Sequence, residues 1–179
     1  SKPYILLNYT DTLKDVFTIV HEMGHSMHSY YTRRTQPFTY GDHSIFTAEV
    51  ASTVNESLLM HHLLDKETNE TMRRYLINYY IEEFRTTLFR QTMFAEFEML
   101  THKEVENGGV LTAEWMCKLY NDLNHQYFGP ALAPDDYIQY EWARIPHFYR
   151  AFYVYQYATG YSAATAISAK ILAEGEAAR

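Results

Sequence analysis

The sequence predicts an all-α protein with at most one short strand near its N-terminus. Apolar residues recur at helical spacing through most of the 179 residues, and capping residues and helix stops separate these periodic stretches. Only Tyr4–Tyr9 is typical of a strand, because it is short, apolar and followed by Thr10 and Asp11. Because no repeat, low-complexity tract or linker interrupts the chain, we expect a single helical unit over residues 1–179.

The first predicted helix begins after Asp11 or Thr12, either of which can cap it, and runs to about residue 31 with Asp15 in its first turn. A loop follows at 33–46, and an irregular stretch containing prolines runs from 130 to 146. The remaining helices are marked by caps or stops. They are predicted at 47–64 (capped by Thr47), 69–106 (ended by Asn107-Gly108-Gly109), 112–128 (capped by Thr112, ended by Gly129-Pro130) and 149–174.

The composition limits the kinds of partner. A net charge of -7, without any basic stripe, argues against nucleic acid. No apolar run is long enough to cross a bilayer, so we expect no membrane association. The single cysteine, Cys117, excludes an intramolecular disulfide and fits a reducing compartment, so we expect a cytoplasmic protein. The charges between Lys66 and Arg90 are expected to form a solvated helix face. The oligomeric state stays open.

The most informative motif is His21-Glu22-Met23-Gly24-His25, a His-Glu-x-x-His pattern inside the first predicted helix. At this spacing both imidazoles lie on one face of the helix, one turn apart. Two neutral imidazoles in that arrangement can bind zinc, and the Glu22 carboxylate beside them can take a proton from a metal-activated water. The motif therefore predicts a zinc hydrolase.

A catalytic zinc site needs a third protein ligand. A metzincin would place a histidine six residues after His25, but Tyr31 is there, and His28 replaces the glycine of that pattern, so this class is excluded. A glutamate from the next helix remains, and Glu49 and Glu56 can face the same way. One can bind the metal while the other hydrogen-bonds a ligand histidine. Spacing alone does not say which.

Three neighbours of the motif have other expected roles. His28 would close the open position of a catalytic site if it bound zinc, so we expect it to pack or to hydrogen-bond. Gly24 inside a helix costs about 1 kcal/mol relative to alanine, and close approach of another helix or of the substrate would explain it. His43, in a loop after Gly41-Asp42, is expected to be solvated, with substrate contact as the alternative.

Three separated motifs carry a family resemblance that covers essentially the whole chain. They are His21–His28 (HEMGHSMH), Phe46–Glu56 (FTAEVASTVNE), and Ile145–Tyr149 (IPHFY) followed by Phe152–Gly160 (FYVYQYATG). In this order they resemble the oligoendopeptidase F group of the thimet-oligopeptidase-like zinc peptidases. The resemblance implies a predominantly helical, zincin-like catalytic region.

The resemblance also implies site residues. It implies one zinc ion bound by His21, His25 and Glu49. It implies that Glu22 is the general base and that Glu56 lies near the metal ligands. These assignments follow from the family pattern and not from the spacing alone.

A second group of residues is implied to act on the substrate. By resemblance, His147 and tyrosines of the segment after it contact the substrate and the oxyanion. The spacing from this histidine to the catalytic tyrosine varies within the family, so Tyr153, Tyr155 and Tyr157 are all candidates. We favour Tyr157, then Tyr153.

The sequence therefore predicts a zinc-dependent endopeptidase that hydrolyses internal bonds of short peptides. The resemblance implies a deep channel between helical lobes that excludes folded chains. One alternative is a folded, metal-binding but catalytically incomplete fragment, because the chain opens at Ser1-Lys2-Pro3 without methionine and stops close to a helical pattern. We interpret it as a fragment of a larger catalytic domain. Another alternative is a zinc carboxypeptidase with a similar ligand pattern.

Overall fold

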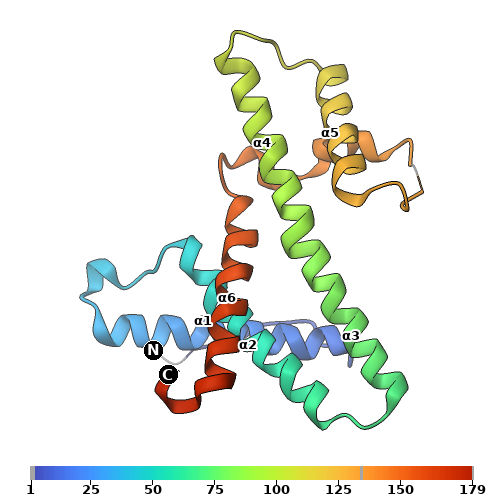
Figure 1. Ribbon diagram of the computed structural model, residues 1–179. Helices are drawn as coiled ribbons and strands as arrows, with labels where there is room; N and C mark the ends of the chain where they lie inside the picture. The colour runs from blue at the N-terminus through green and yellow to red at the C-terminus, as the bar shows by residue number, and fades with distance from the viewer. Residues whose placement is uncertain (1–2, 134, 179) are drawn as a thin grey trace. The chain divides into compact units, whose positions relative to one another are not determined.

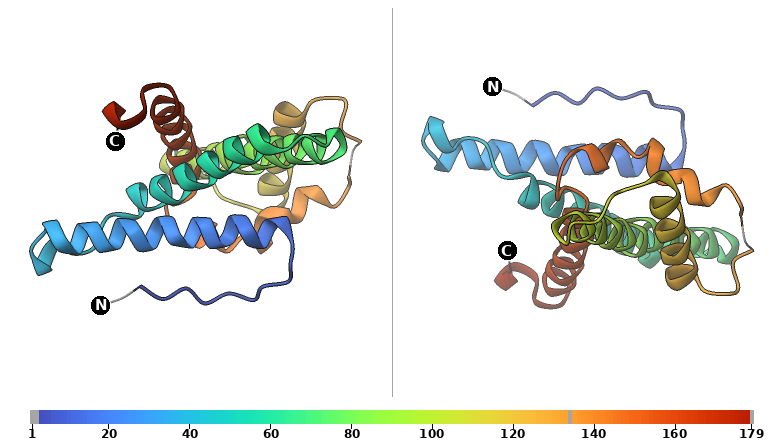
Figure 2. Two further views of the ribbon diagram at one scale, coloured as in Figure 1. Left: turned by 90° about the horizontal axis from the view of Figure 1, so that it is seen from below. Right: turned by 90° about the horizontal axis from the view of Figure 1, so that it is seen from above.

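The computed structural model describes residues 3–133 and 135–178, and these form helices and connecting segments (Figure 1). No strand occurs among them, which confirms the all-α prediction. The predicted strand at Tyr4–Tyr9 is wrong. This segment is extended and runs beside the first helix (Figure 2), with Leu6 99% exposed, but a strand also needs a paired neighbour, and none is found in the described chain.

The helical elements are labelled in chain order. They are α1 (Leu13–Thr35), η1 (Phe38–Tyr40), α2 (Ile45–Lys66), α3 (Glu70–Phe84), the π-helical turn η2 (Arg85–Phe89), α4 (Arg90–Glu106), α5 (Ala113–Phe128), η3 (Ile138–Arg144), η4 (Pro146–Tyr149), α6 (Tyr155–Glu174) and η5 (Gly175–Ala178). Except for η2, the η elements are 3₁₀ turns. No helix among the described residues combines the length and apolar character that crossing a membrane requires.

Local capping determines the helix ends that were predicted correctly. Thr12 caps α1 through a capping box, in which its Oγ accepts the Asp15 N–H (3.3 Å) and the Asp15 carboxylate accepts the Thr12 N–H (3.0 Å). Thr112 caps α5 by accepting the Trp115 N–H. Gly108, with φ +85°, follows the end of α4.

Other boundaries differ from the prediction. Helix α2 begins at Ile45, with Ser44 in the capping position. Thr47 is therefore not the cap, and its hydroxyl donates to the Ser44 carbonyl within the first turn. The last helix begins at Tyr155 and not at 149, because η4 and the left-handed backbone of Phe152 (φ +55°) come first. The helical run predicted at 69–106 is interrupted by η2.

The chain divides into two compact units, Ser1–Glu83 with Thr159–Arg179, and Phe84–Ala158. The expectation of a single unit over 1–179 stays a prediction. The first unit has a core of Phe17, Met60 and Leu76, with Phe17 stacked on Tyr79 (ring centroids 4.9 Å apart). The core of the second unit is larger and contains Met93, Phe94, Phe97, Tyr120, Leu123, Ile145 and Val154. Each unit thus has its own buried apolar cluster.

Candidate metal centre

Helices α1 and α2 approach very closely at Gly24. A Cβ on Gly24 would lie 2.6 Å from the Ser52 Cα and 2.9 Å from the Ala51 carbonyl oxygen, and Ser52 is fully buried. Only a residue without a side chain fits here. Approach of a second helix therefore explains the glycine, and this contact brings Glu49 to the His-Glu-x-x-His face of α1.

The structure brings His21, His25 and Glu49 together. The two histidine Nε2 atoms are 3.1 Å apart, and Glu49 Oε2 lies 3.4 Å from Nε2 of His21 and 3.6 Å from Nε2 of His25. A tetrahedral zinc ion with bonds of about 2.0–2.2 Å separates its ligand atoms by about 3.3 Å. The three atoms match one face of such a tetrahedron, so these residues could hold a metal ion. Their role as ligands stays a prediction.

Glu56 lies on the other side of the His21 ring. The Glu56 carboxylate can only accept, so Nδ1 of His21 donates to Glu56 Oε1 over 3.0 Å. With its proton on Nδ1, the neutral His21 ring has a lone pair at Nε2. This is the atom that faces His25 and Glu49. The geometry separates the two candidate glutamates, because Glu49 faces the Nε2 atoms and Glu56 orients the ring from behind.

The negative surroundings of His21 favour a positive charge. Burial lowers the pKa of His21, but the hydrogen bond and charge of Glu56, together with the charges of Glu49 and Glu22, raise this pKa overall. The same carboxylates would attract a divalent cation to the Nε2 atoms.

Glu22 borders an open hollow of about 520 Å³ between the N-terminal segment and α1. His25 also lines this hollow, and Arg33 and Arg34 lie on its wall. Glu22 directly follows His21 along α1 and is partly exposed at this hollow. A carboxylate in this place is accessible to water and adjacent to the candidate ligands, as a general base requires.

The second unit contains a cluster formed by His147, Tyr153 and Tyr157. The Tyr153 ring is nearly parallel to that of His147 (9°, centroids 5.4 Å apart), and the Tyr157 ring meets His147 edge-on at 5.8 Å. The Tyr157 hydroxyl donates to the Tyr153 hydroxyl over 3.2 Å. The structure thus joins the predicted substrate-binding residues, and their roles stay predictions.

Comparison with known proteins identifies the family. The profile of peptidase family M3 matches residues 1–179. The chain belongs to peptidase family M3. It is 55% identical to oligopeptidase PepF of Bacillus subtilis over 98% of this chain and 26% of the relative. It is 51% identical to the chromosomal oligoendopeptidase F of Lactococcus lactis subsp. cremoris over 96% of this chain and 29% of the relative.

A solved structure of the same group agrees with this assignment. The crystal structure of oligoendopeptidase-F from Enterococcus faecium superposes with a TM-score of 0.80 and 48% identity, over 93% of this chain and 30% of that one. These comparisons confirm the resemblance to oligoendopeptidase F. The chain spans between 26% and 30% of the length of these three M3 relatives.

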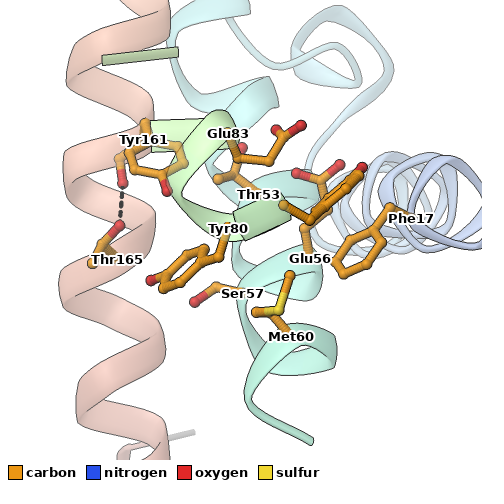
Figure 3. Close-up of a pocket in the computed structure, with 10 residues that line it drawn as sticks. Phe17, Thr53, Glu56, Ser57, Met60, Tyr80, Glu83, Tyr161 and Thr165 are labelled. Atoms are coloured by element: carbon orange, nitrogen blue, oxygen red, sulfur yellow. Dashed lines mark hydrogen bonds between the residues drawn. The ribbon is translucent and has the colours of Figure 1, made fainter. Parts of the chain in front are cut away.

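A small cavity lies behind Glu56 in this M3 chain (Figure 3). Its volume of about 20 Å³ suits one water molecule. It is bordered by two carboxylates, Glu56 from α2 and Glu83 from α3, and by hydroxyl groups such as those of Tyr80 and Tyr161. Burial and, to a smaller extent, the charge of Glu56 raise the pKa of Glu83. The charges of Lys14 and His21 lower this pKa, but by less. Glu83 was expected on a solvated helix face, but it is partly buried, because α3 turns it toward α2.

His28 packs on His43 and does not join the candidate ligands. Their rings are stacked at 3.9 Å and 21°, and the buried Nδ1 atoms of both have no hydrogen-bond partner among the described residues. Burial and the neighbouring charges of His43 and His25 lower the pKa of His28, so its ring favours the neutral form. This agrees with the packing role expected for His28. The expectation of a solvated His43 is wrong, because its ring covers His28.

Proposed function

We propose that this M3 chain carries the metal centre of a zinc-dependent endopeptidase that hydrolyses internal bonds of short peptides. The observation that carries the proposal is the triangle of His21 Nε2, His25 Nε2 and Glu49 Oε2, with edges of 3.1, 3.4 and 3.6 Å. The names of the relatives, oligopeptidase and oligoendopeptidase, support the substrate class. The cytoplasmic location expected from the sequence stays a prediction.

In the proposed mechanism, His21, His25 and Glu49 hold the metal, and Glu56 orients the His21 ring. A bound zinc ion supplies a Lewis acid for the scissile carbonyl and lowers the pKa of a water molecule. Glu22 would take a proton from the attacking water and return it to the leaving nitrogen. Glu22 suits both transfers because it lies beside the ligands and borders the open hollow.

We assign the stabilisation of the oxyanion to the cluster in the second unit. His147 and Tyr157, with Tyr153 as the second tyrosine candidate, offer an N–H and hydroxyl donors. Their ring contacts hold the three rings in place, so only the Tyr157 O–H, which here donates to Tyr153, has to turn when charge develops on the substrate. Tyrosine rings also offer an apolar face to peptide side chains.

The test uses the full-length protein and a short, end-blocked, quenched fluorescent peptide. We expect a chelator to abolish cleavage and zinc to restore it. We expect Glu22→Gln to retain zinc but to lose about 10²–10⁴-fold in kcat. Glu70→Gln, a control on the exposed start of α3, should leave the rate unchanged. Cleavage that is insensitive to chelator, or that survives Glu22→Gln, would exclude this mechanism.

The end-blocked peptide also separates endopeptidase from carboxypeptidase. A carboxypeptidase needs a free C-terminal carboxylate, so cleavage restricted to the unblocked peptide would favour that alternative. Mass spectrometry of the products locates the cleaved bond.

A second candidate function follows from the length of the chain, which spans 26–30% of its relatives. The isolated 179 residues would then fold and bind zinc but lack the surfaces that position a peptide. Zinc binding without turnover by the isolated chain supports this candidate, whereas turnover at the rate of the full-length protein excludes it.

A further inference from the structure

The connection between η4 and α6 is a turn that the apolar core anchors at both ends. The Phe148 ring lies 5.3 Å from that of Phe94 and 5.2 Å from that of Phe97, and Val154 is fully buried. Between these anchors, Phe152 adopts a left-handed backbone with φ +55°. A residue with a large side chain rarely keeps this conformation unless its surroundings impose it.

The group that holds this turn is Glu98 of α4. Its side chain is buried, with 5% of the residue exposed, and its Oε1 accepts the backbone N–H of Phe152 over 2.5 Å. The His102 ring packs on that of Phe152 at 4.6 Å, and His102 Nδ1 is bonded to the Glu98 carbonyl. Burial of a carboxylate costs free energy unless the carboxylate is hydrogen-bonded. The Glu98 carboxylate is hydrogen-bonded to Phe152, the residue with the left-handed backbone.

The strained residue immediately precedes Tyr153. The Tyr153 ring is stacked on His147, its hydroxyl accepts from Tyr157, and the Arg150 guanidinium carbon lies 5.2 Å from its ring centroid. The backbone direction at Phe152 determines where the Tyr153 ring can lie. A change of this dihedral would therefore move Tyr153 off His147.

We propose that Glu98 is a positioning residue, which holds the left-handed turn at Phe152 and thereby sets Tyr153 against His147 and Tyr157. This inference rests on the proposed function, in which that cluster acts on the substrate. The effect of Glu98 passes through the backbone of Phe152, whose N–H its carboxylate accepts. The sequence offered no signal for it, because Glu98 is one of several glutamates in a predicted helix.

The test compares three variants of the full-length protein. Glu98→Leu removes the acceptor at similar size, and Glu98→Gln keeps a carbonyl oxygen in its place. Glu96→Leu is the matched control, because Glu96 lies on the same helix and accepts from Tyr127 (2.6 Å), away from the turn. The readouts are kcat and KM for the quenched peptide, zinc content, and the NMR shift of the His147 ring, assigned by its loss in His147→Gln.

We expect Glu98→Leu to bind zinc normally, to change KM by less than about threefold, and to lose about 10²-fold in kcat, as small misplacements of reacting groups do. The His147 resonance should move because the ring current of Tyr153 is lost. Glu98→Gln should restore both to near the parent values, and Glu96→Leu should change neither. A Glu98→Leu protein with the kcat and His147 shift of the control would overturn the proposal.

A second variant covers the case in which Glu98→Leu does not fold. Glycine adopts a left-handed backbone without a Cβ penalty, so Phe152→Gly should relieve the need for the anchor. The double variant Glu98→Leu/Phe152→Gly should therefore recover the parent His147 shift. A folded double variant without that shift overturns the proposal. The NMR readout needs no turnover, so failure of the proposed peptidase activity would leave this test intact.

Discussion

Gly24 and Ser52 lie so close that a Cβ on Gly24 would come within 2.6 Å of the Ser52 Cα. The contact involves backbone on both sides, and backbone cannot move aside as the tip of a side chain can. The position of Glu49 relative to His21 and His25 depends on this contact, because Glu49 precedes Ser52 by one turn of α2.

We predict that Gly24→Ala destabilises the protein by about 1–3 kcal/mol through overpacking, although alanine is the better helix former. Separation of α1 and α2 should also lower zinc affinity at least about tenfold, because the ligand triangle opens. Urea unfolding and zinc competition with a chromophoric chelator measure the two effects.

Gly160→Ala is the matched control for Gly24→Ala. Its new Cβ would lie 3.8 Å from the Glu49 Cβ, an ordinary contact, so we expect a change below about 1 kcal/mol and unaltered zinc affinity. Equal behaviour of the two alanine variants would show that the close approach at Gly24 is unimportant.

Glu49 and Glu56 should differ in what their removal does to zinc binding. Loss of Glu49 removes a proposed ligand, so Glu49→Ala should no longer bind one zinc ion per chain. Loss of Glu56 removes only the partner of His21 Nδ1, so Glu56→Ala should lower zinc affinity about 10–100-fold, and Glu56→Gln less, since its amide oxygen still accepts. Competition titration gives the ranking. The reverse order would make Glu56 the ligand.

The tyrosines of the second unit are distinguished by removal of single hydroxyls. If Tyr157 donates to the oxyanion, Tyr157→Phe should lower kcat about 10²–10³-fold with KM little changed. Tyr153→Phe should have a smaller effect, because the Tyr153 hydroxyl only accepts the Tyr157 O–H, which in the proposed mechanism turns from Tyr153 to the oxyanion. Tyr155→Phe should stay within about threefold of the parent. A large loss only in Tyr155→Phe would refute the assignment.

The partly buried Glu141 predicts a pH-dependent stability. Its side chain is 9% exposed and accepts from Arg90 (2.6 Å) and from the hydroxyl of the buried Tyr120 (2.7 Å). Burial raises the pKa of Glu141, but these hydrogen bonds and the charges of Arg90 and Arg144 lower it overall, below the ordinary value of 4.5. A carboxyl group with a lower pKa in the folded state stabilises the fold above pH 4.5, and this contribution is lost as the pH falls through the folded value.

Glu141→Gln should therefore destabilise the protein by about 1–3 kcal/mol at pH 7, since it breaks a partly buried ion pair. The difference from the parent should shrink below pH 4.5. Chemical unfolding at pH 7, 5 and 4 measures it. The control is Asp122→Asn, which breaks the exposed Lys118–Asp122 pair and should cost below about 1 kcal/mol at all three values. A constant difference between parent and Glu141→Gln would contradict the assigned pKa direction.

Local patterns account for the parts of the fold that the sequence predicted well. The Thr12 capping box, the Thr112 cap and the glycines after Glu106 act within one helical turn, so they can be read without the tertiary structure. The left-handed backbone of Phe152 and the π-helical turn η2 were not predicted. The backbone of Phe152 depends on a distant residue, because its N–H donates to Glu98 across 54 positions.

The sequence by itself determined the helical class, the pairing of His21 with His25 on one helix face, and the family resemblance, because all three depend on spacing within short segments. Only the tertiary structure decided which glutamate faces the Nε2 atoms. Glu49 and Glu56 share a face of α2, and it is the crossing of α1 and α2 at Gly24 and Ser52 that brings Glu49 to within 3.4 Å of His21 Nε2 and leaves Glu56 at Nδ1. A crossing point is set by packing between helices, which residue spacing along one helix does not encode.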